Sequence, residues 1–250
     1  MSKKLFLPYL LAQYPSAPVF DDLFDLTAQY ADGIEIGIPF SDPVADGPVI
    51  RQATSQVLAQ GFKIESVFLM LQRRRLEIPI ALMSYANPIL AYGRDAFFKA
   101  CKDSGVISLI VPDVPFEESG DWKEAAHQAG LIWISFISLV TREQRLQQIA
   151  STAEGFIYLL SLTGITGADI RSAEQIRKTA SAIRTHTSVP IALGFGIKSA
   201  DDVIRFRESA DAFIVGSRII QQLLENPRTD AVQGLLREFR SVISAEGARC

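Results

Sequence analysis

Short apolar runs rich in isoleucine, valine, leucine and phenylalanine recur along the chain, and stretches with helical spacing of apolar residues separate them. This rhythm predicts strands that alternate with helices. The expected strands are residues 5–11, 33–38, 79–84, 106–111, 131–136, 155–160, 189–194 and 210–215. The expected helices are residues 19–31, 48–60, 63–75, 94–104, 117–129, 142–152, 172–186 and 199–208, with a last helical region after residue 217.

Strands that are joined through helices run parallel, and parallel strands buried on both faces are apolar almost throughout, as these are. Eight such units close naturally into a barrel, whereas a doubly wound sheet more often has five or six strands and an early glycine-rich turn. We therefore expect an α/β fold, a (β/α)8 TIM barrel with extra helices. At 250 residues the chain has the usual length of one such barrel, so residues 1–250 are expected to form a single domain.

The composition excludes several classes of function. A net charge of -3 gives no field that would attract nucleic acid or an anionic membrane surface. No apolar run reaches the roughly 18 residues that a membrane helix needs. The two cysteines, Cys101 and Cys250, have no metal-ligand or disulfide spacing, so we expect no metal site and a cytoplasmic location.

One acidic residue, Glu35, stands inside the second expected strand. Because side chains alternate along a strand, Ile34, Ile36 and Ile38 share one face and Glu35 takes the other. The apolar face should meet the helices, which points Glu35 into the barrel. An ionised carboxylate is costly to bury there unless it is paired or its pKa rises, and no expected strand contains a lysine or arginine.

A second acidic residue, Asp46, lies in the loop of residues 39–48 that follows this strand. Functional sites of β/α barrels form at the carboxyl ends of the strands and in the loops after them. Two carboxylates are thus expected to converge on one mouth of the barrel. A purely structural role, as a turn or N-cap residue, stays open for Asp42 and Asp46.

Glycines follow the last two expected strands, where barrels often bind phosphate. Gly194 and Gly196 follow the seventh strand, and Gly216 and Ser217 follow the eighth, just before a helical stretch. Glycine lets backbone N–H groups approach an anion, and the amino end of a helix adds unpaired donors. Either piece alone would be an ordinary turn, but together they predict a phosphate site.

Two chemistries known in barrel enzymes lack their residues in this chain. A Schiff-base aldolase needs a lysine pointing from a strand into the barrel, and the expected strands contain none. A metal aldolase needs clustered histidines, but His127 and His186 are the only two, and both fall in polar helical stretches. We therefore expect neither chemistry, and no cofactor in this chain.

Five segments, spread over most of the chain, together resemble the tryptophan synthase α-subunit family. The most distinctive is IEIGIPFSDPVADGPVI at 34–50, in which the glutamate and the aspartate have the separation seen in that family. The others are MSYANP at 83–88, LIVPDVPFEES at 109–119, LTGITGAD at 162–169 and GFGI at 194–197.

The resemblance implies a lyase of tryptophan biosynthesis that splits indole-3-glycerol phosphate into indole and glyceraldehyde 3-phosphate. It implies that Glu35 is the general acid and base at the indole C3 and the glycerol hydroxyl, and that Asp46 accepts a hydrogen bond from the indole N–H. Tyr158 matches a tyrosine near the glycerol part of the substrate.

The resemblance also assigns residues around the substrate. A lid over residues 163–169 is expected to supply Thr166, which hydrogen-bonds the loop aspartate, and Gly167, which contacts phosphate. The indole ring is expected to lie in an apolar slot made of Tyr9, Ile50, Met83, Ile110 and Phe195, although each of these could be ordinary core. Asp113 matches an aspartate near the active-site loops, and a capping role is equally open.

A partner is implied as well. The loop around Asp42 and Pro43 resembles the contact region for a β subunit, which carries pyridoxal phosphate and receives the indole. The family assembles as an α2β2 heterotetramer with allosteric coupling in both directions.

The chain departs from the family pattern at two places. After the first strand it reads Gln13-Tyr14-Pro15 where Gly-Asp-Pro or Gly-Tyr-Pro is usual, and Ile107 stands where Gly-Val-Asp has its aspartate. We expect the missing carboxylate to alter the network that orients the lid and the loop aspartate. This leaves open a second function, a weakly active or inactive partner that activates a β subunit. A third candidate, a phosphosugar isomerase, would leave the segment from Glu35 to Asp46 unexplained.

Overall fold

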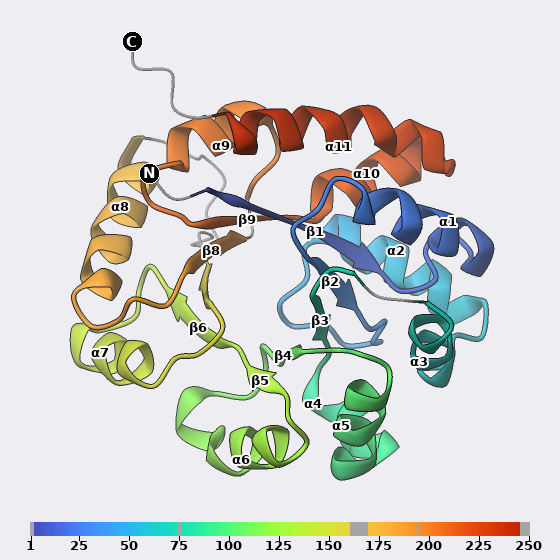
Figure 1. Cartoon of the computed structure of the whole chain (residues 1–250), viewed down its shortest axis with the longest axis horizontal. Helices are drawn as coiled ribbons and strands as arrows, with labels where there is room; N and C mark the ends of the chain where they lie inside the picture. The colour runs from blue at the N-terminus through green and yellow to red at the C-terminus, as the bar shows by residue number, and fades with distance from the viewer. Residues whose placement is uncertain (1–2, 75–76, 161–169, 195, 246–250) are drawn as a thin grey trace.

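The computed structural model describes residues 3–74, 77–160, 170–194 and 196–245. In these ranges nine parallel strands form one sheet, and helices surround it (Figure 1). The strands are β1 (Leu5–Leu11), β2 (Ile34–Gly37), β3 (Ile80–Met83), β4 (Ser108–Ile110), β5 (Ile132–Trp133), β6 (Ser135–Ser138), β7 (Ile157–Leu160), β8 (Ile191–Gly194) and β9 (Ala212–Val215).

Most connections between the strands contain a helix, as the parallel arrangement requires. The α-helices are α1 (Ala17–Ala28), α2 (Pro48–Ala59), α3 (Glu65–Gln72), α4 (Ala86–Tyr92), α5 (Arg94–Asp103), α6 (Gly120–Gln128), α7 (Glu143–Ser151), α8 (Ile170–Arg184), α9 (Ala200–Phe206), α10 (Ser217–Glu225) and α11 (Thr229–Ser244). A short 3-10 helix, η1 (Phe116–Glu118), precedes α6.

The ring of strands is closed by the chain itself. The sheet order is β5-β4-β3-β2-β1-β9-β8-β7-β6, so β5 and β6 are its two ends. Only Ile134 separates these strands in the sequence, and its N–H donates to the carbonyl of Leu109 at 2.9 Å. The segment 132–138 therefore pairs first with β4 and then with β7, and it occupies one of the eight strand positions of the barrel. The predicted (β/α)8 barrel is confirmed, with the strand predicted at 131–136 divided and extended to Ser138.

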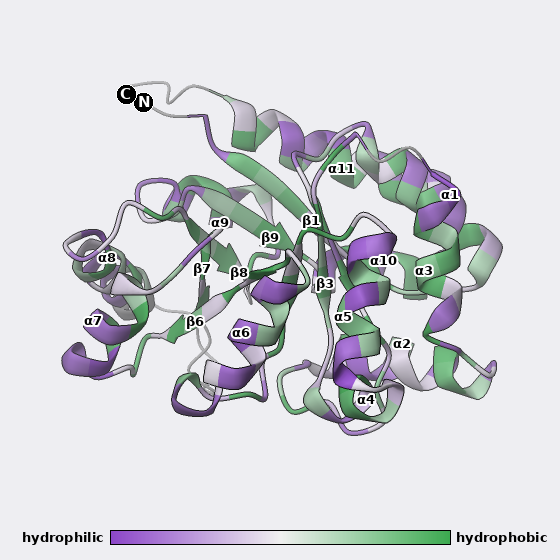
Figure 2. Cartoon of the chain, turned by 60° about the horizontal axis from the view of Figure 1, so that its bottom comes forward, coloured by the Kyte–Doolittle hydropathy of each residue, from purple (hydrophilic) through white to green (hydrophobic). Residues whose placement is uncertain are grey.

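The strands are buried on both faces, and the helices cover them with apolar stripes, while their polar faces point outward (Figure 2). Every residue of β2, β8 and β9 is buried. On the outer side of β1, the ring of Phe6 stacks against Phe239 of α11 with centroids 6.0 Å apart. The last helix thus closes over the strand that begins the barrel.

Helix α4 lies where the sequence analysis placed only a loop. Its third residue is Pro88, a position in the first turn at which the missing N–H costs nothing. The first N–H of the helix, on Ala86, donates to both carboxylate oxygens of Asp113, at 3.0 and 3.1 Å. Of the two roles left open for Asp113, the structure shows the capping one.

The two departures from the family pattern lie in different parts of the barrel. Ile107 directly precedes β4, so it stands on the rim where strands begin, opposite to the loop that carries Asp46. The expectation that this position influences the loop aspartate was wrong, because Ile107 and Asp46 lie at opposite ends of the barrel. Gln13 follows β1, has a φ of 60°, and donates from Nε2 to the hydroxyl of Ser66 at 2.6 Å.

Candidate active site

Glu35 is held in the interior of the barrel by its place in β2. It pairs in register with Tyr9 of β1 and Ala81 of β3, and it is 2% exposed. Among the residues that the structure describes, neither carboxylate oxygen has a hydrogen-bond partner. Burial, and then the nearby charge of Asp46, raises the pKa of Glu35 from 4.5 to about 8. The group is therefore mostly protonated at neutral pH, and it can donate a proton.

Asp46 faces the same space from the loop between β2 and α2. Burial raises the pKa of its carboxyl, while a hydrogen bond from Tyr85 and the charge of Arg51 act in the opposite direction. The hydroxyl of Tyr85 also accepts a hydrogen bond from the N–H of Ala45 at 3.2 Å. Tyr85 therefore fixes both the loop backbone and the carboxylate, and the two acids have different surroundings.

The rings of Tyr9 and Tyr158 fill the space around the two acids, and each ring fits there because a neighbouring glycine has no side chain. A Cβ atom at Gly37 would overlap the ring and hydroxyl of Tyr9, and one at Gly194 would overlap the ring and hydroxyl of Tyr158. Burial raises the pKa of both phenols well above 10, and the neighbouring carboxylates add to the effect. Both hydroxyls thus stay protonated at neutral pH in the surroundings of Glu35.

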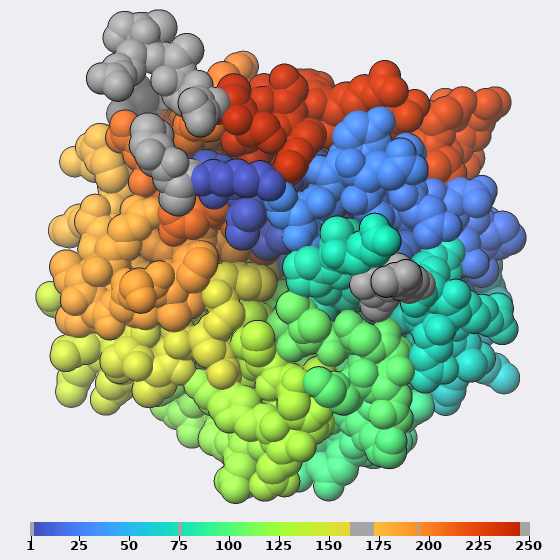
Figure 3. All heavy atoms as spheres, viewed as in Figure 1, coloured from blue at the N-terminus to red at the C-terminus, as the bar shows by residue number. Residues whose placement is uncertain are grey.

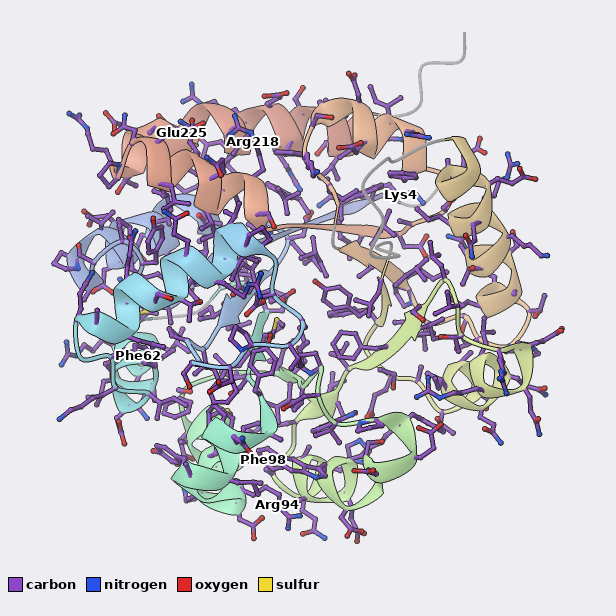
Figure 4. The ribbon with its side chains drawn as sticks, turned by 180° about the vertical axis from the view of Figure 1, so that it is seen from behind. Lys4, Phe62, Arg94, Phe98, Arg218 and Glu225 are labelled. Atoms are coloured by element: carbon purple, nitrogen blue, oxygen red, sulfur yellow. The ribbon has the colours of Figure 1, made fainter. Side chains whose placement is uncertain are left out.

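These side chains surround a cavity of about 30 Å³ at the carboxyl ends of the strands, which we call the upper cavity. It is about large enough for one water molecule. Helix α10 begins at its edge and runs outward past Arg218 to Glu225 (Figure 4). The upper cavity is lined by Tyr9, Glu35, Asp46, Ile50, Met83, Tyr158, Gly196, Ile197, Ile214, Gly216 and Ser217.

The structure brings together most of the residues predicted for the site. Nine of the lining residues were predicted, and Ile197 and Ile214 are additional. Ile110 does not line the cavity: it is fully buried in β4, so its expected place in the indole slot is not supported. Gly194 lies against the ring of Tyr158 and outside the lining. Thr166, Gly167 and Phe195 lie outside the described residues.

The loop residues Asp42 and Pro43 are near the site in sequence but not in the cavity lining. Asp42 is exposed and accepts a hydrogen bond from the hydroxyl of Ser41 at 2.5 Å, and the neighbouring Val44 is 78% exposed. The predicted contact region therefore presents an apolar side chain to the outside.

Three contributors to the site escaped the sequence analysis. Tyr85 lies within the segment MSYANP, which was used only as a mark of resemblance, and a polar aromatic residue just after the third strand was a usable signal. Arg51 lies near the start of α2, five residues after Asp46, and its charge acts on that carboxyl. Gly37 follows Glu35 in β2, and only the neighbouring ring of Tyr9 reveals why it is a glycine.

The described part of the chain contains no group of three or more metal-ligating side chains. His127 contacts the carboxylate of Glu154 at 2.6 Å on the surface. No helix among the described residues has both the length and the apolar content to span a membrane.

Comparison with known proteins agrees with the geometry. A profile described as "Tryptophan synthase alpha chain" matches residues 1–243. The tryptophan synthase alpha chain of Caldicellulosiruptor saccharolyticus is 38% identical over 241 residues, which are 96% of this chain and 94% of the relative.

Solved structures are similar over nearly the full length. A structure of Mycobacterium tuberculosis tryptophan synthase aligns with a TM-score of 0.89 and 27% identity, covering 98% of this chain and 94% of the other. The tryptophan synthase complex from Pyrococcus furiosus aligns with a TM-score of 0.84 and 30% identity, covering 97% and 99%.

The fold and the site define a β/α barrel with one buried and one partly buried acid at the carboxyl ends of its strands, the arrangement of a barrel enzyme that uses carboxylates. Within that class, the chain belongs to the tryptophan synthase alpha chain family.

The tight contact between Gly37 and Tyr9 generates a prediction about stability. The substitution Gly37→Ala should lower the free energy of unfolding by about 1–3 kcal/mol, because the added methyl group overpacks the space that the ring occupies. The cost should largely disappear in a Tyr9→Leu background, which chemical denaturation of the double-mutant cycle measures. Gly47→Ala is the control, since nothing lies within 4 Å of its added Cβ. An equal cost in both backgrounds would contradict the assignment.

The raised pKa of Glu35 predicts how stability depends on pH. The pKa of Glu35 is about 8 in the folded state and 4.5 in the unfolded state, so with rising pH its carboxyl ionises first in the unfolded chain. The contribution of Glu35 therefore lowers the free energy of unfolding more and more as pH rises between these two values. Relative to the wild type, Glu35→Gln should gain roughly 4 kcal/mol of stability between pH 5 and pH 8, at about 1.4 kcal/mol per pKa unit. Denaturation curves across that range measure the difference. The exposed Glu143→Gln should show no such trend, and a constant difference for Glu35→Gln would refute the raised pKa.

Proposed function

We propose that this chain splits indole-3-glycerol phosphate into indole and glyceraldehyde 3-phosphate. The observation that carries this proposal is the protonated, buried carboxyl of Glu35 facing Asp46 across one cavity. Family membership supplies the substrate, and the site supplies the acid and base that the reaction needs.

In the first step, protonated Glu35 donates its proton to C3 of the indole ring. The ring nitrogen then carries positive charge, and Asp46 accepts the hydrogen bond from its N–H and stabilises that charge. The different environments of the two carboxyls favour these roles. Tyr85 and Arg51 oppose the rise in the pKa of Asp46, and none of the described residues does so for Glu35.

In the second step, the carboxylate of Glu35 takes the proton of the hydroxyl on the carbon attached to C3. The carbon–carbon bond breaks, its electron pair restores the indole ring, and the hydroxyl carbon becomes the aldehyde of glyceraldehyde 3-phosphate. Glu35 ends protonated as it began, so protons balance without a cofactor. Tyr158, beside Glu35, is suited to hold the glycerol part.

The phosphate group is proposed to bind at Gly196, Gly216 and Ser217, where the amino end of α10 meets the upper cavity, with Gly167 and Gly194 completing the site. Tyr9, Ile50, Met83 and Phe195 would contact the indole ring, and Thr166 would bond to Asp46.

The proposed partner is a tryptophan synthase β subunit that carries pyridoxal phosphate, in an α2β2 assembly. The similar Pyrococcus furiosus structure is of a tryptophan synthase complex, and the exposed loop with Asp42, Pro43 and Val44 offers an apolar contact beside the site. The chain is further proposed to act in the cytoplasm as one domain over residues 1–250.

The alternative of an inactive partner finds no support in the residues at which the sequence departs from the family. Ile107 stands on the opposite rim, and neither it nor Gln13 is among the residues that line the upper cavity. The acid pair on which the chemistry depends is complete.

The test adds indole-3-glycerol phosphate to the pure chain, with and without a β subunit, and follows indole release. Glu35→Gln should lower kcat by about two to four orders of magnitude, the usual contribution of a positioned proton-transfer group. The exposed Glu143→Gln is the matched control, and its kcat should stay within about twofold of the wild type. Glu35→Gln should still activate the β subunit. Absence of turnover in the unmutated chain under both conditions, with β activation intact, would overturn the lyase proposal and favour the partner function.

A further inference from the structure

A second cavity opens at the other end of the barrel, and the proposed reaction does not use it. This lower cavity has a volume of about 200 Å³ and lies where the strands begin. Its wall comes from strands on all sides of the barrel, including Leu5 and Leu7 of β1, Ala81 of β3, Ile132 of β5 and Ala212 of β9. Figure 3 shows the face at which it opens, with the start of β1 in blue.

The mouth of the lower cavity is apolar although it is open to solvent. Ile107 is 43% exposed there, and Pro79 and Pro190 are exposed beside it. An isoleucine is an unfavourable residue to leave in water at this position. Exposed apolar side chains around a concave opening are typical of a site that accepts an apolar molecule.

The polar side chains that line the cavity are few, and the most exposed one is already engaged. Asp32 accepts hydrogen bonds from the N–H of Phe6 at 2.9 Å, from Lys3 at 2.7 Å and from Arg240 at 2.5 Å. Its charge is therefore compensated within the protein. The remaining polar side chains in the lining are Ser108 and Glu35.

Glu35 lines both cavities, so it forms the boundary between them. Its carboxyl has no hydrogen-bond partner among the described residues, and burial keeps it uncharged at neutral pH. A molecule in the lower cavity would thus meet a neutral wall at its inner end and apolar side chains around it.

We propose that the lower cavity binds a compact, uncharged aromatic molecule between benzene and indole in size, from the side of Glu35 opposite to the upper cavity. Apolar cavities of about 150 Å³ accept benzene, and this one is larger. A charged ligand would leave its charge unpaired against an apolar wall, which is strongly unfavourable. Water in such a cavity is weakly held, so its displacement by an apolar group favours binding. The proposal does not depend on the lyase reaction.

The experiment is a titration of the full chain with toluene, followed by NMR of 13C-labelled isoleucine and leucine methyl groups. We expect saturable shifts at Leu5, Leu7, Ile107 and Ile132, and none at Ile50 or Ile197 in the upper cavity. Ile107→Asp should weaken binding by about tenfold or more, because the ligand would then bury a carboxylate at the mouth. The matched control is Ile204→Asp, at a 61% exposed isoleucine of α9 outside both cavities, which should bind as the wild type does.

A second variant, Ala81→Leu, fills part of the lower cavity and should also weaken toluene binding. The proposal therefore stays testable even if Ile107→Asp fails to fold. Shifts confined to Ile50 and Ile197 would mean that toluene enters the upper cavity, and they would overturn the proposal. Non-saturating shifts, or equal affinity in Ile107→Asp and Ile204→Asp, would overturn it as well.

Discussion

The exclusion of water from the carboxyl of Glu35 is the constraint on which the site depends. The residue stands between β1 and β3 in a sheet that is buried on both faces, and no described group donates a hydrogen bond to it. A carboxyl in that position is far more stable with its proton than without it. Asp46 differs because Tyr85 donates to it and Arg51 lies near. One barrel mouth thereby holds a proton donor and a hydrogen-bond acceptor made from the same chemical group.

The residues around the two acids define the shape of the site. The rings of Tyr9 and Tyr158 occupy the space above the strands, and they fit only because Gly37 and Gly194 lack side chains. The loop that carries Asp46 is fixed through the contact of Ala45 with Tyr85, which itself follows β3. The barrel supplies these positions because its strands end at one rim, where side chains distant in sequence meet.

Much of the fold and of the site could be predicted from the sequence, because the spacing of apolar residues and the succession of strands and helices can be recognised along the chain. The alternation around Glu35 correctly placed it inward, and the position of Asp46 after the same strand placed both acids at one mouth. Helix α4 was missed because its start depends on Asp113, a carboxylate from another strand's loop. Ile110 was expected in the indole slot but does not line the upper cavity, because the sequence of a buried strand does not reveal which apolar residues face a cavity. The effect expected of Ile107 on Asp46 was wrong because Ile107 directly precedes β4, on the rim opposite to Asp46, a position that the expected parallel strands already implied.

The central claim is that the protein interior holds the Glu35 carboxyl protonated at neutral pH. A 13C NMR titration of the chain labelled at glutamate carboxyl carbons, with Glu35 assigned by comparison with Glu35→Gln, measures this directly. A midpoint near pH 8 is the predicted result. A midpoint near 4.5, the ordinary value for a glutamate, would contradict the account.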